Sequence, residues 1–144
     1  MTSGLRNMKA HIAILDDDHQ RVAAMRNFLA RFLPQCKPVA FDNAPDLIQW
    51  LQNHLRSTVL ISLDHDLGPS RTFGTGQEVV TYLTTQRPAC PVIVHSANYL
   101  AAPGMEQMLI DSGWTCCRVI PLNDLDWIDE AWIPEVQRYI QDRR

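Results

Sequence analysis

Two groups of aspartates follow short apolar runs of the sequence, and their carboxylates have the chemistry of a metal and phosphate site. The first group closes the run that begins at His11, and the second closes the run that begins at Val59. The five acids are Asp16, Asp17, Asp18, Asp64 and Asp66. Crowded carboxylates repel one another unless a cation compensates, and oxygen-rich carboxylate sites suit Mg²⁺ or Mn²⁺ together with water and phosphate. The pattern therefore predicts a metal-dependent phosphate site.

Helix capping is the alternative explanation for one acid of the first group. Aspartate is a favoured N-cap, and Asp17 is followed three residues later by Gln20, which is the spacing of a capping box. We therefore expect one of the three consecutive acids to cap the helix that follows. Capping does not explain the second group, which follows a different strand.

Strand-like and helix-like patterns alternate along the chain and indicate which elements must position the acids. Apolar runs predict strands at 11–16, 39–42, 58–64, 91–96 and 115–122. Apolar residues at helical spacing predict helices at 18–33, 44–55, 75–85, 105–112 and 129–142. Three of the strands are nearly continuous apolar runs, which is typical of parallel strands covered on both faces. Acids that follow such strands meet at the carboxyl edge of the sheet, where open α/β folds bind ligands.

Five such units without a repeat or a linker predict a single doubly wound α/β domain. We assign the domain to residues 9–144 and expect a loose tail at 1–8. The 144 residues are the size of one ordinary domain, and a hydrophobic fraction of 46% is enough for a full core. The cysteines show no CxxC spacing, so we expect free thiols at Cys36, Cys90, Cys116 and Cys117.

Charge and hydropathy exclude several classes of function. A net charge of −3 and an isoelectric point near 5.9 argue against broad electrostatic binding of DNA or RNA, which needs a basic surface. No apolar stretch approaches the roughly 18 residues needed to span a bilayer. The first residues also lack the apolar core of a signal peptide. We therefore expect a cytoplasmic protein that binds neither nucleic acid nor membrane.

The order of these residues resembles the receiver domain of two-component response regulators from about residue 9 onward. Asp16 and Asp17 match the receiver's metal-binding acids, Asp64 matches its phospho-accepting aspartate, and Ser96 matches the hydroxyl that contacts the phosphoryl group. The resemblance implies a flavodoxin-like (βα)5 fold with parallel strand order 2-1-3-4-5. It also implies a divalent ion, Mg²⁺ or Mn²⁺, held by Asp16, Asp17 and Asp64.

Two departures separate the chain from an ordinary receiver. The receiver lysine before the proline that ends the last strand is Ile120 here, and a second acid, Asp66, follows the phospho-acceptor position. Together with His65, His95 and Asn98, these residues resemble a divergent branch of receiver-like domains that is predicted to process cyclic phosphates. That resemblance implies hydrolysis of a cyclic or nucleotide-derived phosphate.

The residues of such a site divide into two roles. The candidate catalytic residues are Asp64, His65, Asp66, His95 and Ser96. Histidine titrates near neutrality, so His65 or His95 is expected to act as general acid or base. The candidate phosphate-binding residues are Arg21, Ser96 and Asn98. Arg21 lies about one helical turn beyond the acidic run, which makes it the best local replacement for the missing lysine, ahead of Arg71 and Arg118. His19 is expected to cap the first helix or line the site.

Several alternatives stay open at this point. Two alternatives to the enzyme are a stand-alone receiver phosphorylated at Asp64 by a histidine kinase or a small phosphodonor, and a degenerate receiver that only binds partner proteins. The Asp64-His65-Asp66 motif also resembles the paired acids of haloacid-dehalogenase phosphatases and of Toprim nucleases. The Toprim pattern requires a glutamate after the first strand, where this chain has aspartate. The sequence leaves the substrate and the oligomeric state undetermined.

Overall fold

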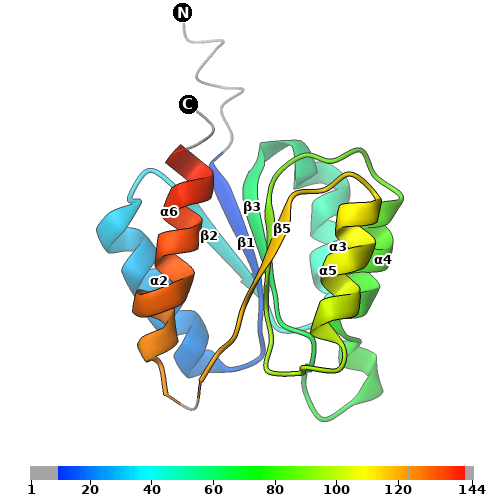
Figure 1. Ribbon diagram of the computed structural model, residues 1–144, viewed down its shortest axis with the longest axis horizontal. Coiled ribbons are helices and arrows are strands. Elements are labelled where there is room, and N and C mark those ends of the chain that lie inside the picture. The colour runs from blue at the N-terminus through cyan, green and yellow to red at the C-terminus, as the bar shows by residue number, and fades with distance from the viewer. Residues whose placement is uncertain (1–9, 123, 142–144) are drawn as a thin grey trace, which may run out of the picture.

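The computed structural model describes residues 10–122 and 124–141, so the expected tail at 1–8 lies outside the described residues. The described chain forms a parallel sheet with strand order β2-β1-β3-β4-β5, which is the predicted doubly wound order (Figure 1). The strands are β1 (His11–Leu15), β2 (Lys37–Phe41), β3 (Thr58–Leu63), β4 (Val92–His95) and β5 (Cys116–Val119).

Helices cover both faces of the sheet. Figure 1 shows α2 and α6 on one face, and α3, α4 and α5 on the other. The helices are α2 (His19–Phe32), α3 (Ala44–His54), α4 (Gly76–Thr84), α5 (Ala102–Asp111) and α6 (Ile133–Gln141). Short turns lie at η1 (Leu55–Ser57) and η2 (Arg71–Phe73), and a π-turn, η3 (Ile128–Trp132), leads into α6. No helix in the described part of the chain is long and apolar enough to cross a membrane.

The core explains why the central strands read as continuous apolar runs. Side chains alternate along β1, so that Ile12 and Ile14 pack under α2 and α6, whereas Ala13 and Leu15 pack under α3 and α4. All four are fully buried. Burying one large aliphatic side chain contributes about 1.5–3 kcal/mol, so both faces of the strand stabilise the fold.

Several element boundaries differ from the sequence prediction. Strand β2 begins at Lys37 rather than at residue 39, because an edge strand accepts a proline such as Pro38. Helix α5 begins at Ala102, three residues before the predicted start. Strand β5 ends before Ile120, whose side chain is 65% exposed. These differences lie at the ends of elements, and the order of the elements is as predicted. The helix predicted at 129–142 is divided into the π-turn η3 and helix α6.

Candidate metal and phosphate site

Three aspartates from two neighbouring strands meet at the carboxyl edge of the sheet. Asp16 directly follows β1, Asp64 directly follows β3, and the two strands pair in parallel. One carboxylate oxygen from each of Asp16, Asp17 and Asp64 lies within 4.8 Å of the other two. Asp16 and Asp64 are 2% and 6% exposed. The sheet therefore brings together the acids that the sequence placed at the ends of separate strands.

Each of these carboxylates is held by a backbone N–H group through one oxygen, which leaves the other oxygen for further partners. The three hydrogen bonds run from the amides of Asp18, Gly68 and His65 to Asp16 Oδ1, Asp17 Oδ2 and Asp64 Oδ1, at 2.8, 2.7 and 2.7 Å. Carboxylates fixed in this way are preorganised ligands, because their orientation does not have to be restricted when an ion binds.

The helix cap is Asp18 rather than Asp17. The Asp18 carboxylate accepts hydrogen bonds from the backbone N–H groups of Gln20 and Arg21 at the start of α2. The capping-box spacing of Asp17 and Gln20 was therefore misleading, because Asp17 points across to the loop after β3 and binds Gly68 instead. One of the three consecutive acids caps the helix, as expected, and the other two belong to the cluster.

The loop after β3 is shaped by two glycines. Gly68, which donates to Asp17, has a φ of 46°, and a Cβ there would also collide with the ring of Phe73. A Cβ on Gly76 would collide with the backbone carbonyl oxygen of Asp64. The start of α4 thus approaches the end of β3 at a distance that only glycine permits. Close packing of α4 against the end of β3 therefore accounts for Gly76.

Arg21 brings a cation to the cluster. Its Nη1 atom lies 3.5 Å from Asp16 Oδ2 and 3.6 Å from Asp64 Oδ2. Of the other two arginines considered, Arg118 pairs with Glu106, and Arg71 is exposed on η2. Arg21 on α2 therefore supplies positive charge beside the carboxylates, at a different place in the fold from the missing receiver lysine at Ile120.

The pKa values of the two inner carboxyl groups are shifted in opposite directions. Burial raises the pKa of Asp64 to about 6, and repulsion from the Asp16 carboxylate adds to the rise. Burial is also the largest single influence on Asp16 and acts in the same sense, but the interactions with His95, the Asp18 amide and Arg21 together outweigh it and hold the pKa of Asp16 below its usual value. A buried carboxyl with a raised pKa beside an ionised one is a site that a cation would stabilise.

The donor set fits Mg²⁺ or Mn²⁺. All three candidate ligand atoms are carboxylate oxygens, the class that these ions prefer. Mg²⁺ holds its ligands at about 2.0–2.1 Å, so two oxygens on one ion lie at most about 4.2 Å apart. The separations of up to 4.8 Å require only a small inward movement of the side chains.

A histidine, an aspartate and an asparagine form a second group at the mouth of the site. The Nδ1 atom of His65 lies 2.8 Å from Asp66 Oδ1, and the Asn98 amide nitrogen lies 3.3 and 3.4 Å from the two Asp66 oxygens. The side chains of His65 and Asp66 are 17% and 72% exposed. When Nδ1 donates to Asp66, the proton-accepting nitrogen of His65 is Nε2. The structure thus brings three predicted site residues together beside the carboxylates.

Ser96 and His95 are both buried. The Ser96 hydroxyl accepts a hydrogen bond from the backbone N–H of Asn98 at 3.0 Å, and Ser96 is 5% exposed. His95 is fully buried, and its two ring nitrogens lie 3.0 Å from Asp16 Oδ2 and 2.6 Å from Ser62 Oγ. This placement does not favour the direct proton transfer predicted for His95, because its ring has no contact with solvent.

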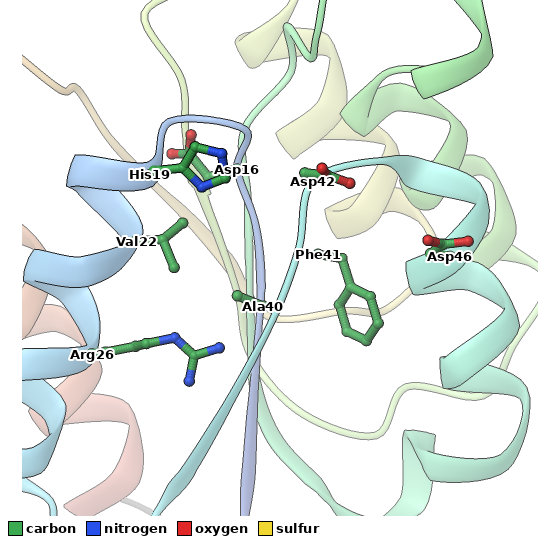
Figure 2. A pocket seen from close by; sticks show the side chains of 8 residues that line it. All are labelled: Asp16, His19, Val22, Arg26, Ala40, Phe41, Asp42 and Asp46. Atoms are coloured by element: carbon green, nitrogen blue, oxygen red, sulfur yellow. The ribbon is translucent and has the colours of Figure 1, made fainter.

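A cavity of about 460 Å³ lies on the other side of Asp16, between α2 and β2 (Figure 2). Its polar lining residues are Asp16, His19, Arg26, Asp42 and Asp46, with Val22, Ala40 and Phe41 between them. His19, Val22 and Arg26 share one face of α2, at helical spacing. His19 therefore does not cap the helix, whose N-cap is Asp18, and it lines a cavity that Asp16 also borders.

The fold and the carboxyl-edge cluster define a receiver domain. The chain belongs to the family of cyclic-phosphate processing Receiver domains, whose model matches residues 12–111. Comparison with curated proteins found no match.

Solved receiver structures share the fold at low identity. The phosphorylated cyanobacterial phytochrome response regulator RcpA is 15% identical with a TM-score of 0.71, over 92% of this chain and 94% of that one. The receiver domain of the Francisella response regulator 1452 is 13% identical with a TM-score of 0.68, over 94% of this chain and 100% of that one. A Burkholderia pseudomallei response regulator with a phosphorylated aspartic acid, a calcium ion and citrate is 14% identical with a TM-score of 0.61, over 90% of this chain and 72% of that one.

Sequence reasoning missed two buried residues, Ser62 and Trp132, which connect to the site from the core through His95. Ser62 bonds His95, and the Trp132 indole donates to Ser62 at 2.9 Å. A signal for Ser62 was present, because it is the one hydroxyl between apolar residues in the interior of β3. No local signal could have found Trp132, which lies 70 residues away from its partner.

Proposed function

We propose that this protein is a metal-dependent phosphodiesterase that opens a cyclic, nucleotide-derived phosphate by hydrolysis. The observation that supports the proposal most directly is the His65–Asp66 pair, joined at 2.8 Å and placed directly after the candidate metal ligand Asp64. A histidine oriented by a carboxylate is a common arrangement for general acid–base catalysis.

The proposed ligands of the ion are Asp16, Asp17 and Asp64. A bound Mg²⁺ or Mn²⁺ would supply neutralisation of the phosphate oxygens as negative charge develops on them. Arg21 contributes a second positive charge at the same edge of the sheet, because it lies beside Asp16 and Asp64. The amide of Asn98 holds Asp66 and is available to orient a phosphate oxygen.

His65 is the proposed proton carrier. In hydrolysis a water oxygen bonds to phosphorus, one phosphorus–oxygen bond of the ring breaks, and the leaving oxygen becomes a hydroxyl group. The attacking water loses a proton to His65 Nε2, and the protonated His65 then gives this proton to the leaving oxygen, so the product is a ring-opened phosphomonoester and His65 returns to its neutral form. Asp66 keeps the ring of His65 in the tautomer that accepts at Nε2.

The part of the substrate beyond the phosphate is assigned to the cavity between α2 and β2. Its volume of about 460 Å³ is within the usual range for small-ligand pockets, and Asp16 borders both the cavity and the acidic cluster. Arg26, Asp42 and Asp46 offer charged groups of both signs there, which suits a ligand rich in hydroxyl or amino groups such as a nucleoside (Figure 2).

The direct test is turnover of nucleoside 2′,3′- and 3′,5′-cyclic monophosphates with Mg²⁺ or Mn²⁺, followed by ³¹P NMR. We expect ring opening that falls by about 10²–10⁴-fold in His65→Gln, the usual contribution of a general acid or base. His54→Gln is the matched control, because His54 lies at the end of α3 and stacks on Trp50. Absence of turnover with every compound, or equal turnover in His65→Gln and the wild type, would refute the proposal.

A second function, phosphorylation of Asp64 as in a signalling receiver, is favoured by one observation. Arg21 Nη1 lies 3.6 Å from Asp64 Oδ2, where it could balance the charge of an acyl phosphate. One of the similar structures contains a phosphorylated aspartic acid, and another is described as phosphorylated, although these are only 14–15% identical to this chain. Incubation with a histidine kinase or with acetyl phosphate, followed by intact-mass measurement, distinguishes the two functions. A stable phosphorylated species without turnover of any cyclic phosphate would favour the receiver function.

A further inference from the structure

A chain of hydrogen bonds runs from the acidic cluster into the core of the protein. His95 Nε2 lies 3.0 Å from Asp16 Oδ2, and His95 Nδ1 lies 2.6 Å from Ser62 Oγ. The indole Nε1 of Trp132 donates to the same Ser62 oxygen at 2.9 Å. Ser62, His95 and Trp132 have no exposed surface, and Asp16 is only 2% exposed. Four polar side chains from distant segments of the chain are therefore joined, and three of them are fully buried.

The donors and acceptors available assign the protons in this chain. An indole N–H can only donate, so Ser62 Oγ accepts from Trp132. His95 Nε2 faces a carboxylate oxygen of Asp16, which can only accept, so Nε2 carries a proton and donates it. In the neutral imidazole the other nitrogen, Nδ1, then accepts, and the Ser62 hydroxyl proton is directed to it. By occupying one acceptor position of Ser62 Oγ, the Trp132 indole favours this orientation of the hydroxyl proton and with it the Nε2–H tautomer of His95.

The π-turn η3 places two tryptophans against this chain. Trp127 stacks on His95 with ring centroids 5.9 Å apart and an interplanar angle of 20°, and Trp132 follows five residues later. Residues five apart in an α-helix differ by about 140° around the axis. The bond from the Ile133 N–H to the Ile128 carbonyl spans five residues, and this wider turn brings positions five apart to one side. The irregular turn therefore allows both indoles to pack inward.

We propose that Ser62 and Trp132 are positioning residues of the metal site, which hold His95 in its Nε2–H form and thereby fix the Asp16 carboxylate for an ion. Asp16 is then held from two sides, by the Asp18 amide on Oδ1 and by His95 on Oδ2. Hydrogen bonds that orient metal ligands typically contribute 10–100-fold to metal affinity. This inference rests on the metal site of the proposed function, and it assigns His95 to ligand positioning rather than to proton transfer.

The two tryptophans provide a matched pair of substitutions. Both side chains are almost fully buried, at 1% and 0% exposure, and Trp→Phe makes the same change of size at each. Trp132 Nε1 has a partner in Ser62, whereas Trp127 Nε1 has none among the described residues. Trp132→Phe therefore removes a hydrogen bond of the chain, whereas Trp127→Phe keeps an aromatic ring against His95 and removes an N–H group that bonds none of the described residues.

The experiment measures Mn²⁺ affinity by calorimetry in the full-length protein, together with the ring nitrogens of His95 by two-bond ¹H–¹⁵N NMR. We expect Trp132→Phe and Ser62→Ala each to weaken Mn²⁺ binding by about tenfold. Trp127→Phe should leave the affinity unchanged within error. In the wild type, without metal, the His95 spectrum should show the Nε2–H tautomer.

Three results would contradict the inference or its basis, and they are distinguishable. An Nδ1–H tautomer in the wild type would overturn the proton assignment, and this measurement requires no variant to fold. Mn²⁺ affinity that is unchanged in Trp132→Phe and Ser62→Ala, or weakened equally in Trp127→Phe, would overturn the positioning role alone. Failure of the wild type to bind Mn²⁺ would overturn the metal site and with it the proposed function.

Discussion

Replacing Asp64 with asparagine should make the metal-free protein more stable at neutral pH and leave its stability unchanged in acid. Burial raises the pKa of Asp64 to about 6 in the folded protein, from an ordinary value of 3.8. A carboxyl group with a raised folded pKa binds its proton more tightly in the folded state than in the unfolded state. The free energy of unfolding therefore falls as pH rises from about 4 to about 6, and this loss stays constant above that range. Asp64→Asn removes the loss.

The size of the effect follows from the difference between the two pKa values, about 6 minus 3.8. Roughly two pKa units at about 1.4 kcal/mol each amount to about 3 kcal/mol of unfolding free energy at pH 7. Asp64 is only 6% exposed, so solvent screening reduces this figure little. Asparagine keeps an oxygen that can accept the hydrogen bond from the His65 amide. A change of about 3 kcal/mol corresponds to a rise in Tm of about 6–12 °C in a domain of this size.

The assay is urea unfolding in EDTA at half-unit steps from pH 4 to pH 7.5, for wild type and variant. The difference in unfolding free energy should be near zero at pH 4 and should increase to a plateau above pH 6. Asp66→Asn is the matched control, because the Asp66 side chain is 72% exposed and an exposed charge contributes little to stability. Parallel curves for wild type and Asp64→Asn across the whole range, or a less stable variant at pH 7, would refute the electrostatic reasoning.

Three further outcomes are expected. Mg²⁺ or Mn²⁺ at one hundred times its Kd should raise the unfolding free energy of the wild type by about 3 kcal/mol. The double variant Asp17→Asn, Asp64→Asn should show no rise in Tm with metal and should be equally or more stable than the wild type without it. A rise in Tm that survives both substitutions would show that the ion binds elsewhere. Arg21→Gln should tighten Mn²⁺ binding, because Arg21 lies 3.5 and 3.6 Å from oxygens of two proposed ligands and competes with the ion for them. Titration calorimetry tests this prediction, with Arg26→Gln as the control. Weaker Mn²⁺ binding in Arg21→Gln would count against it. Gly76→Ala should destabilise the fold by about 1–3 kcal/mol, because the new Cβ would collide with the carbonyl oxygen of Asp64. Gly104→Ala in α5 is the control, because its Cβ has open space around it and the change should be neutral or stabilising. Equal thermal stability of the two variants would show that α4 can move away from β3.

The architecture and the acidic cluster were predictable because both follow from local patterns. Continuous apolar runs indicate strands buried on both faces, and a parallel arrangement brings their carboxyl ends to one edge. Asp16 and Asp64 therefore had to lie close together once their strands were neighbours, as the pairing of β1 with β3 shows. Arg21 was predictable for a similar reason, because its distance from the acidic run is fixed by one turn of helix.

The tertiary structure decided the contacts that depend on where side chains of distant segments point. Asp17 and Asp18 have the same side chain, and only the position of Gly68 on the loop after β3 shows that Asp17 belongs to the cluster while Asp18 caps α2. The same limit applied to His95, whose position at the end of an apolar strand was compatible with a reactive or a structural role.

Trp132 shows most clearly why contacts between buried polar groups could not be predicted from the sequence. Its hydrogen bond to Ser62 joins residues 70 positions apart and requires a π-turn, which the spacing of apolar residues does not predict. A sequence pattern determines which face of an element is buried, because burial depends on each residue's own polarity. It does not determine which buried polar groups meet, because that depends on the relative position of elements that pack only when the whole domain has folded.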